Sequence, residues 1–160
     1  MAGFFTKLHG TLTLKDAANT PDTFSDVSLE TGDMSIDGLE PSNKSTFEVY
    51  ARGAFVGLEH GDDAKVTFSC TYHQKRETLH HASADRLVDF LTKQGGFASD
   101  TSANPGDAGV WMCNALFTMT DGTTTATITL SKCRITFSIS DGEPNAIKLS
   151  GTCYGGVVYA

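Results

Sequence analysis

Alternation of apolar and polar residues recurs along most of this chain and constrains its fold more than any other feature. In residues 64–74, Val66, Phe68, Cys70 and Tyr72 alternate with hydroxyl and charged residues. Successive side chains of a β-strand point to opposite faces, so a period of two predicts strands with one buried and one solvated face. The pattern predicts about seven or eight strands, in residues 4–16, 24–30, 31–38, 64–74, 110–120, 125–140 and 146–160.

The alternation changes phase inside one predicted strand, residues 125–140. The inward positions are even-numbered up to Leu130 and odd-numbered from Cys133 onward. One extra residue in a strand moves every later side chain to the other face. We therefore expect a β-bulge near Ser131 and Lys132.

One segment, residues 83–94, has helical periodicity instead. Its apolar residues form one stripe: Ala84, Leu87, Val88 and Leu91. Ser83 suits the N-cap position, and Gly95 is expected to end the helix. Asp89 and Lys93 have the spacing of a surface ion pair.

A lone amphipathic helix must lay its stripe on a sheet face or a barrel end. The expected fold is therefore mainly β, a β-sandwich or partly closed barrel with one flanking α-helix. At 160 residues the chain is expected to form a single domain, residues 1–160.

Residues 39–63 interrupt the core pattern. Phe47 and Val49 alternate with charged residues, but Gly53 and Gly57 break the run, which closes on the turn sequence "EHGDD". A monomer would not be expected to expose the apolar residues of this stretch. We expect a long arm or loop here that serves as a contact surface.

The overall charge and hydropathy exclude several classes of protein. A net charge of −7 argues against binding nucleic acid by neutralising phosphates. No run of about 18 apolar residues is present, so no membrane span is expected. The first ten residues lack the basic segment and long apolar run of a secretory signal, so synthesis in the cytoplasm is expected.

The cysteines and histidines do not form a recognisable reactive motif. None of the four cysteines, Cys70, Cys113, Cys133 and Cys153, lies in a CxxC pair. Each falls on the apolar phase of a strand, which predicts buried thiols, although one or two disulfides stay possible. The adjacent His80 and His81 would need a third metal ligand, and we expect them to be exposed or to cap the helix.

Motifs for catalysis are also missing from the sequence. It contains no G-x-S-x-G elbow, no phosphate-binding glycine loop and no calcium-binding loop. We therefore expect no enzyme activity, no catalytic residues, no metal and no cofactor.

Four stretches resemble the tail tube proteins of tailed bacteriophages. They are "VSLETGDMSIDGLE", "VYARGAFVGLEHGDDAKVTFSCTY", "SADRLVDFLTKQ" and "DGTTTATITLSKCRITFSISDGEPNAIKLSGTCYGGV". They are similar to the early β segment, the arm with its following core strand, the single mid-chain helix and the C-terminal hairpins of that family. Together they span most of the chain.

The resemblance implies a structural protein of the virion tail, assembled in the host cytoplasm. Subunits would form rings, usually hexameric, that stack into a hollow tube and deliver DNA into the host. Partners would be other copies of the chain, the tape measure, tail terminator and baseplate or tip proteins, and DNA that passes without specific binding; no membrane is involved. The lumen of such tubes tends to be acidic, which agrees with the net charge.

The same resemblance places subunit and ring contacts on the arm, about residues 39–63, and on the chain termini. The candidate contact residues are Phe4, Phe5, Phe47, Glu48, Arg52, Phe55, Val56, Leu58, Glu59, Asp62, Asp63, Tyr154 and Tyr159. Ring closure would also satisfy the open edges of a β-sheet, which monomers must otherwise protect.

Two other functions are also compatible with the sequence. A ring protein of a related contractile injection or type VI secretion tube would share these features. A monomeric β-sandwich carbohydrate-binding module would instead expose aromatic platforms, whereas the single tryptophan, Trp111, lies in phase with a core face.

Overall fold

The computed structural model describes residues 9–21, 23–29, 34–39, 44–63, 65–73, 86–107, 109–120, 122–141 and 146–160. Within these ranges the chain is mainly β, as predicted, with ten strands and one short α-helix. The strands are β1 (His9–Lys15), β2 (Thr23–Leu29), β3 (Met34–Asp37), β4 (Lys44–Ala51), β5 (Ala54–Asp63), β6 (Val66–His73), β7 (Cys113–Thr120), β8 (Thr125–Ser140), β9 (Ala146–Cys153) and β10 (Val157–Tyr159).

Eight of the described strands form one antiparallel sheet. Their order is β2-β1-β7-β8-β9-β6-β3, and β10 pairs with β8 beside the end of β9. The sheet does not close into a barrel, because β2 and β3 lie at the two ends of this order. Of the expected architectures, a β-sandwich or a partly closed barrel, the described residues show the mainly β, antiparallel arrangement, and it is not closed into a barrel.

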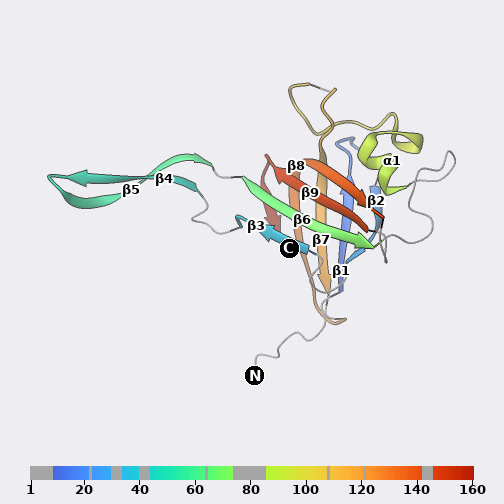
Figure 1. Cartoon of the computed structure of the whole chain (residues 1–160), viewed down its shortest axis with the longest axis horizontal. Coiled ribbons are helices and arrows are strands. Elements are labelled where there is room, and N and C mark those ends of the chain that lie inside the picture. The colour runs from blue at the N-terminus through green and yellow to red at the C-terminus, as the bar shows by residue number, and fades with distance from the viewer. Residues whose placement is uncertain are drawn as a thin grey trace.

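The two halves of this sheet face each other across the core. β6 and β7 are separated by β8 and β9 in the sheet, yet the rings of Phe68 on β6 and Phe117 on β7 lie 5.2 Å apart, edge to face. Figure 1 shows β6 and β9 crossing over β1 and β7. The long strand β8 joins both halves, since its first part pairs with β7 and its second part with β9.

The predicted bulge lies in β8, at the position expected from the phase change. Cys113 pairs with Cys133 and Ala115 with Leu130, so two residues of β8 oppose one residue of β7. Lys132 has φ +55°, and its backbone N–H donates to the Asn114 side-chain oxygen at 3.0 Å. The bulge confirms the prediction, and it lies where β8 passes from one half of the sheet to the other.

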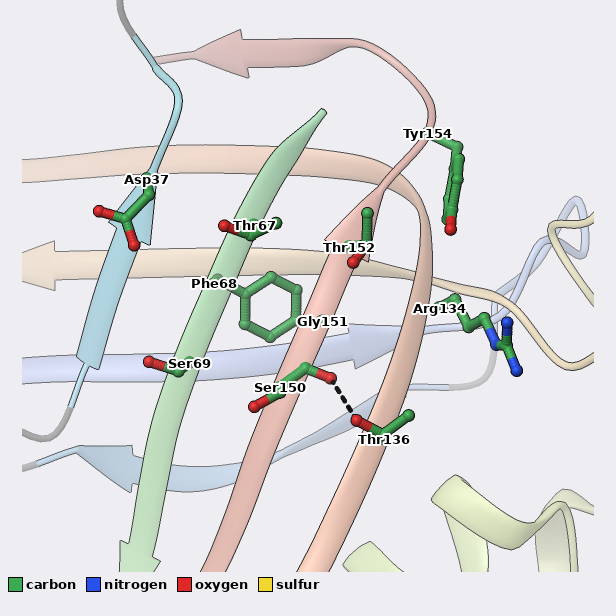
Figure 2. Close-up of a pocket in the computed structure, with 10 residues that line it drawn as sticks. All are labelled: Asp37, Thr67, Phe68, Ser69, Arg134, Thr136, Ser150, Gly151, Thr152 and Tyr154. Carbon is green, nitrogen blue, oxygen red and sulfur yellow. Dashed lines mark hydrogen bonds between the residues drawn. The ribbon is translucent and has the colours of Figure 1, made fainter. Parts of the chain in front are cut away.

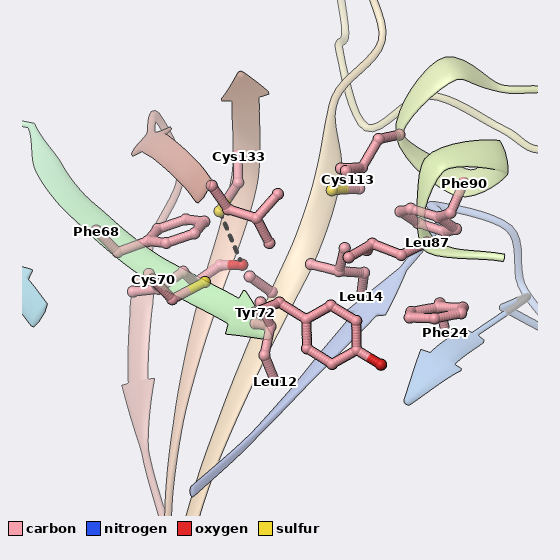
Figure 3. Close-up of a cluster of buried hydrophobic side chains, with 14 of the residues drawn as sticks. Leu12, Leu14, Phe24, Phe68, Cys70, Tyr72, Leu87, Phe90, Cys113 and Cys133 are labelled. Carbon is pink, nitrogen blue, oxygen red and sulfur yellow. Dashed lines mark hydrogen bonds between the residues drawn. The ribbon is translucent and has the colours of Figure 1, made fainter. Parts of the chain in front are cut away.

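The alternating residues bury most of the face that the sequence predicts, but Ala126 and Ile139, at the two ends of β8, are exposed although the alternation places them inward. In Figure 3, Leu12 and Leu14 of β1 lie near Tyr72 of β6, with Phe24 of β2 beside them. The fully buried side chains of this core include Leu12, Leu14, Leu87, Phe90, Phe117, Leu130 and Cys133. All four cysteines are buried free thiols, as predicted.

The helix is shorter than expected and ends differently. Helix α1 spans Leu87–Thr92, and Lys93 ends it in the left-handed conformation with φ 55°. Gly95 does not end the helix but begins a 3-10 turn, Gly95–Phe97. The expected N-cap Ser83, together with Ala84, His80 and His81, lies outside the described residues.

The buried face of α1 also differs from the expected stripe. Leu87 and Leu91 are buried as predicted, but Val88 is half-buried and Phe90 is fully buried. The Phe90 ring packs edge to face against Phe97 and Trp111, with centroids 5.1 and 5.5 Å away. These contacts come from the segment after the helix, which covers a second side that the helical period alone does not reveal.

The expected surface ion pair of α1 is wrong. Asp89 is fully buried rather than exposed. The Lys93 ammonium lies 5.7 Å over the Trp111 ring instead of facing a carboxylate across the helix surface. Burial of Asp89 takes its carboxylate away from the solvated side of the helix, where Thr92 is exposed.

Hydrogen bonds hold the described part of the loop after the helix against β1. The backbone N–H of Thr101 donates to the Asp16 carboxylate at 2.9 Å, and that of Ala17 donates to the Thr101 carbonyl at 2.9 Å. The described part of this long polar segment therefore makes direct contacts with the residues that follow β1.

Candidate interaction surfaces

The expected arm forms a two-stranded hairpin, here called the arm hairpin, made of β4 and β5. These strands form a sheet of their own and pair with no other described strand. Figure 1 shows the hairpin extending away from the main sheet. Residues 44–63 of the predicted arm are therefore a projecting hairpin rather than an irregular loop.

The turn of the arm hairpin follows from its sequence. Ala51 pairs with Ala54, which leaves Arg52 and Gly53 as a two-residue loop with φ of 52° and 79°. A type I′ turn requires positive φ at both positions, and it matches the twist of the flanking strands. Glycine adopts this conformation without cost, whereas Arg52 must be held in it by the strand pairing.

Three apolar side chains gather at the end of the hairpin, here called the arm tip. Tyr50, Phe55 and Val56 are 56%, 59% and 63% exposed. The rings of Tyr50 and Phe55 meet edge to face with centroids 5.9 Å apart. Val56 is the extra residue of a bulge, because Val49 pairs with Gly57 while Tyr50 pairs with Phe55.

A polar contact accompanies these side chains. The Tyr50 hydroxyl donates to the Glu48 carboxylate at 2.7 Å. This bond, with a smaller effect of burial, raises the pKa of Tyr50 above its ordinary value of 10.0. The arm tip therefore combines its three exposed apolar side chains with one carboxylate, a mixture that suits a contact with another protein.

The base of the arm hairpin contacts the C-terminal segment. The Tyr159 hydroxyl donates to the carbonyl of Leu39, just before the hairpin, at 3.4 Å. The Lys65 ammonium, just after the hairpin, lies 4.8 Å over the Tyr154 ring. The two tyrosines expected to make subunit contacts thus lie beside the two ends of the arm.

The structure describes only some of the candidate contact side chains. Glu48, Arg52, Phe55 and Val56 are exposed on the arm hairpin, and Tyr154 and Tyr159 are exposed near its base. Phe4 and Phe5 lie outside the described residues. The backbones of five others belong to β4 and β5, but their side chains are not described: Phe47, Leu58, Glu59, Asp62 and Asp63.

Sequence reasoning did not select several exposed apolar residues that the structure shows. Tyr50 shares its strand phase with Glu48 and Arg52, and this shared phase was the signal that it faces solvent. Val158 and Ile139 are also exposed. The alternation of residues 125–140 placed Ile139 inward, so its exposure contradicts that prediction, and the alternation gave no prediction for Val158.

A second surface, the hydroxyl face, covers the solvent side of β3, β6, β9 and the second part of β8. Its hydroxyl residues are Ser35, Thr67, Ser69, Thr71, Thr136, Ser138, Ser150 and Thr152. Figure 2 shows an open depression on this face, of about 470 Å³, between Asp37 and Arg134. The Ser35 and Ser69 hydroxyls are 2.9 Å apart, and the Thr136 hydroxyl donates to the Ser150 carbonyl at 3.3 Å.

The hydroxyl face carries few charges. Its described charged side chains are Asp37, Arg134 and Lys148. Among the residues that the structure describes, no three histidine, cysteine or acidic side chains are placed to hold a metal ion. In the same part of the chain, no helix has the length and apolar character needed to cross a membrane.

Comparison with known proteins does not assign this chain to a family. A scan against protein-family models and a search of curated proteins both found no match.

Proposed function

We propose that this chain is a subunit of a bacteriophage tail tube, which assembles as stacked rings, hexameric by the family resemblance, around a channel for DNA. The observation that carries the proposal is the arm hairpin. It projects from the main sheet, pairs with no other described strand and ends in the exposed Tyr50, Phe55 and Val56. Apolar side chains on a projecting element gain stability only when another surface covers them.

The open sheet edges support an assembly of several copies. In the described structure β2 and β3 each have a strand neighbour on one side only. Unpaired edges template the addition of further strands, so natural monomers blunt or cover them. Neighbouring subunits of a ring would pair these edges, with β3, β6, β9 and β8 forming part of a shared wall.

The hydroxyl face is the part of the described surface best suited to line the channel. One acid, Asp37, and two bases, Arg134 and Lys148, are spread among neutral hydroxyl groups. Tight phosphate binding needs clustered Lys and Arg, since each contact releases counterions. This face lacks the acidic excess that the resemblance implies for a lumen, but with three described charges it also lacks the clustered bases that would hold DNA.

Assembly of a purified tip variant tests the proposal. The wild-type protein should form rings or stacked tubes in negative-stain microscopy and sediment as an oligomer. Phe55→Ser/Val56→Ser should fold normally, as judged by circular dichroism, but should not stack. Wild-type protein that stays monomeric at every protein and salt concentration would refute the proposal.

The matched control is Val110→Ser. Val110 is also apolar and exposed, at 41%, but it lies in the loop before β7 and away from the arm tip. This variant should assemble like the wild-type protein. If it fails to assemble to the same degree, loss of surface apolarity in general, rather than the arm tip, would explain the result.

Hydrogen exchange provides a second readout of the same contact. The backbone amides of residues 48–57 should exchange more slowly in tubes than in free subunits, because docking shields the strands. Equal protection in both states would show that the arm hairpin takes no part in assembly.

Two alternatives lead to different observations. The ring protein of a contractile injection or type VI secretion tube would form similar rings, and gene neighbourhood would separate it from a phage protein. A carbohydrate-binding module would stay monomeric. Trp111 offers little platform for a sugar, because Phe90 packs against its ring and Lys93 lies over it.

A further inference from the structure

Three of the four cysteines lie side by side on adjacent strands. Cys113 of β7 is directly opposite Cys133 of β8, and Cys133 is directly opposite Cys153 of β9. All three are buried free thiols on the core side of the sheet. Cys70 is different, because its strand partners are Met34 and Leu149.

Cys133 and Cys153 occupy directly opposed positions on β8 and β9. The Cys133 thiol donates to the Leu130 carbonyl at 3.5 Å, and the Cys153 thiol donates to the Ser131 carbonyl at 3.1 Å. Directly opposed residues of antiparallel strands have Cα atoms about 4.5–5.5 Å apart. This range falls within the Cα separations of about 4.4–6.8 Å found in disulfides, so a bond requires little backbone movement.

Cys153 is the more accessible member of the pair. It is 3% exposed, whereas Cys133 is fully buried. Its sulfur lies 3.1 Å from the Ser131 carbonyl, beneath the short turn that joins β9 to β10, where Tyr154 and Gly156 are exposed. Only a small reagent can reach a thiol in such a position.

We propose that Cys133 and Cys153 are an oxidation site, at which a small hydroperoxide converts the two thiols into a disulfide between β8 and β9. The Cys153 thiolate attacks one peroxide oxygen, the O–O bond breaks, and a sulfenic acid forms as hydroxide leaves. The Cys133 sulfur then attacks the sulfenic sulfur, the S–S bond forms, the S–O bond breaks, and the oxygen leaves as water with the Cys133 proton. With hydrogen peroxide the two thiols lose two electrons in total, and the peroxide is reduced to two water molecules.

The electrostatics of the three thiols favour this order of events. The neighbouring Cys133 thiol lowers the pKa of Cys153, because it can donate a hydrogen bond to the thiolate. Its position beside Cys153, together with burial, raises the pKa of Cys133. Burial alone raises the pKa of Cys113 to about 12, so Cys113 stays a thiol near neutral pH and does not compete as the nucleophile.

The disulfide would lie next to the bulge that bends β8. There the Gly155 N–H donates to the Ser131 carbonyl at 2.9 Å, and the Tyr154 N–H donates to the Lys132 carbonyl at 3.1 Å. A covalent bond at this point would hold the long strand to β9 where the sheet changes direction. Because both cysteines belong to one chain, the reaction can be tested on the monomer, independently of any assembly.

Disulfide mapping of the native protein is the decisive experiment. Folded wild-type protein is treated with hydrogen peroxide, remaining thiols are alkylated, and peptides are identified by mass spectrometry. The expected product has lost two hydrogen atoms, with Cys133 joined to Cys153 and with Cys70 and Cys113 alkylated. A Cys113–Cys133 bond, or no disulfide while the protein stays folded, would overturn the proposal.

Two alanine variants sharpen the result. Cys153→Ala should abolish the disulfide, and Cys113→Ala should leave its rate of formation unchanged. Addition of a dithiol reductant to the oxidised wild-type protein should restore the starting mass. Because mapping of the wild-type protein decides the question, a variant that fails to fold leaves the test intact.

Discussion

Gly151 of β9 is a position where a single methyl group should destabilise the fold. It pairs directly with Phe68 of β6, and the Phe68 ring lies over it (Figure 2). A Cβ added at Gly151 would lie 2.2 Å from two ring carbons of Phe68. The ring cannot easily move away, because it also packs against Phe117, 5.2 Å between centroids.

The magnitude follows from two opposing effects. Overpacking of a buried site costs about 1–3 kcal/mol. Replacement of glycine inside a strand recovers roughly 0.5–1 kcal/mol of chain entropy. At the middle of both ranges Gly151→Ala should lower the free energy of unfolding by about 1 kcal/mol, and by about 2.5 kcal/mol at most. The mid-range value corresponds to roughly 2–4 °C in the thermal midpoint for a domain of this size.

A double-mutant cycle with Phe68→Leu identifies the cause. Phe68→Leu alone should cost about 1–2 kcal/mol through lost packing. In the double variant the new methyl group fills space that the ring has left, so the combined loss should be smaller than the sum by about 1 kcal/mol. Urea unfolding followed by circular dichroism measures all four proteins.

The control is Gly156→Ala, where a Cβ would meet no atom within 4 Å and φ is not positive. Its free energy of unfolding should change by less than about 0.5 kcal/mol. Additivity of Gly151→Ala and Phe68→Leu within about 0.5 kcal/mol would refute the direct clash. It would mean that the ring already occupies a different position from the one described.

Further predictions concern the helix, the bulge and a buried thiol. Leu87→Asp places a carboxylate at a fully buried site and should prevent folding, which would be seen as loss of soluble protein. The double variant His80→Ala/His81→Ala should leave folding and assembly intact. If that double variant folds but loses function, the structural interpretation of this segment is wrong. Lys132→Gly should stabilise the protein by up to about 1 kcal/mol in urea unfolding, because the left-handed conformation costs a non-glycine residue about 1–2 kcal/mol. A destabilised variant would show that the Lys132 side chain makes a stabilising contact. Burial raises the pKa of Cys113 from 9.0 to about 12. The contribution of this thiol to stability is therefore complete below pH 9 and is lost as the pH rises towards 12. Cys113→Ala should make the fall in the free energy of unfolding between pH 9 and 12 less steep, and an unchanged pH profile would contradict the assignment.

The strands could be predicted because a period of two leaves a residue only two choices of face. Leu12, Leu14 and Phe117 are buried where the alternation places them. The bulge at Lys132 was predictable for the same reason, since any change of phase within a strand needs an extra residue. Local sequence determines these features, and the hydrophobic face determines the register.

The helix could not be predicted in the same detail. It has six residues, which is too short for helical propensity to set its ends. Phe97 and Trp111 cover its second side, and both come from later in the chain. Lys93 adopts a conformation that favours glycine, so the search for a C-cap glycine pointed to Gly95 instead.

The interaction surface was predictable in location but not in form. Mixed apolar and charged residues marked residues 39–63 as an arm. The bulge at Val56 breaks the alternation of the second strand, and this hid the hairpin. Tyr50 was missed because its neighbours in strand phase, Glu48 and Arg52, are charged.

The isolation of the arm hairpin links its stability to its proposed role. A two-stranded hairpin is marginally stable by itself in water, and β4 and β5 pair with no other described strand. Within the hairpin, the described side-chain contacts are the meeting of the Tyr50 and Phe55 rings and the hydrogen bond from Tyr50 to Glu48. Docking of the arm tip on a second copy would cover the same apolar side chains and stabilise the hairpin. Order in the arm and assembly of the subunits would then be thermodynamically coupled, so that each strengthens the other.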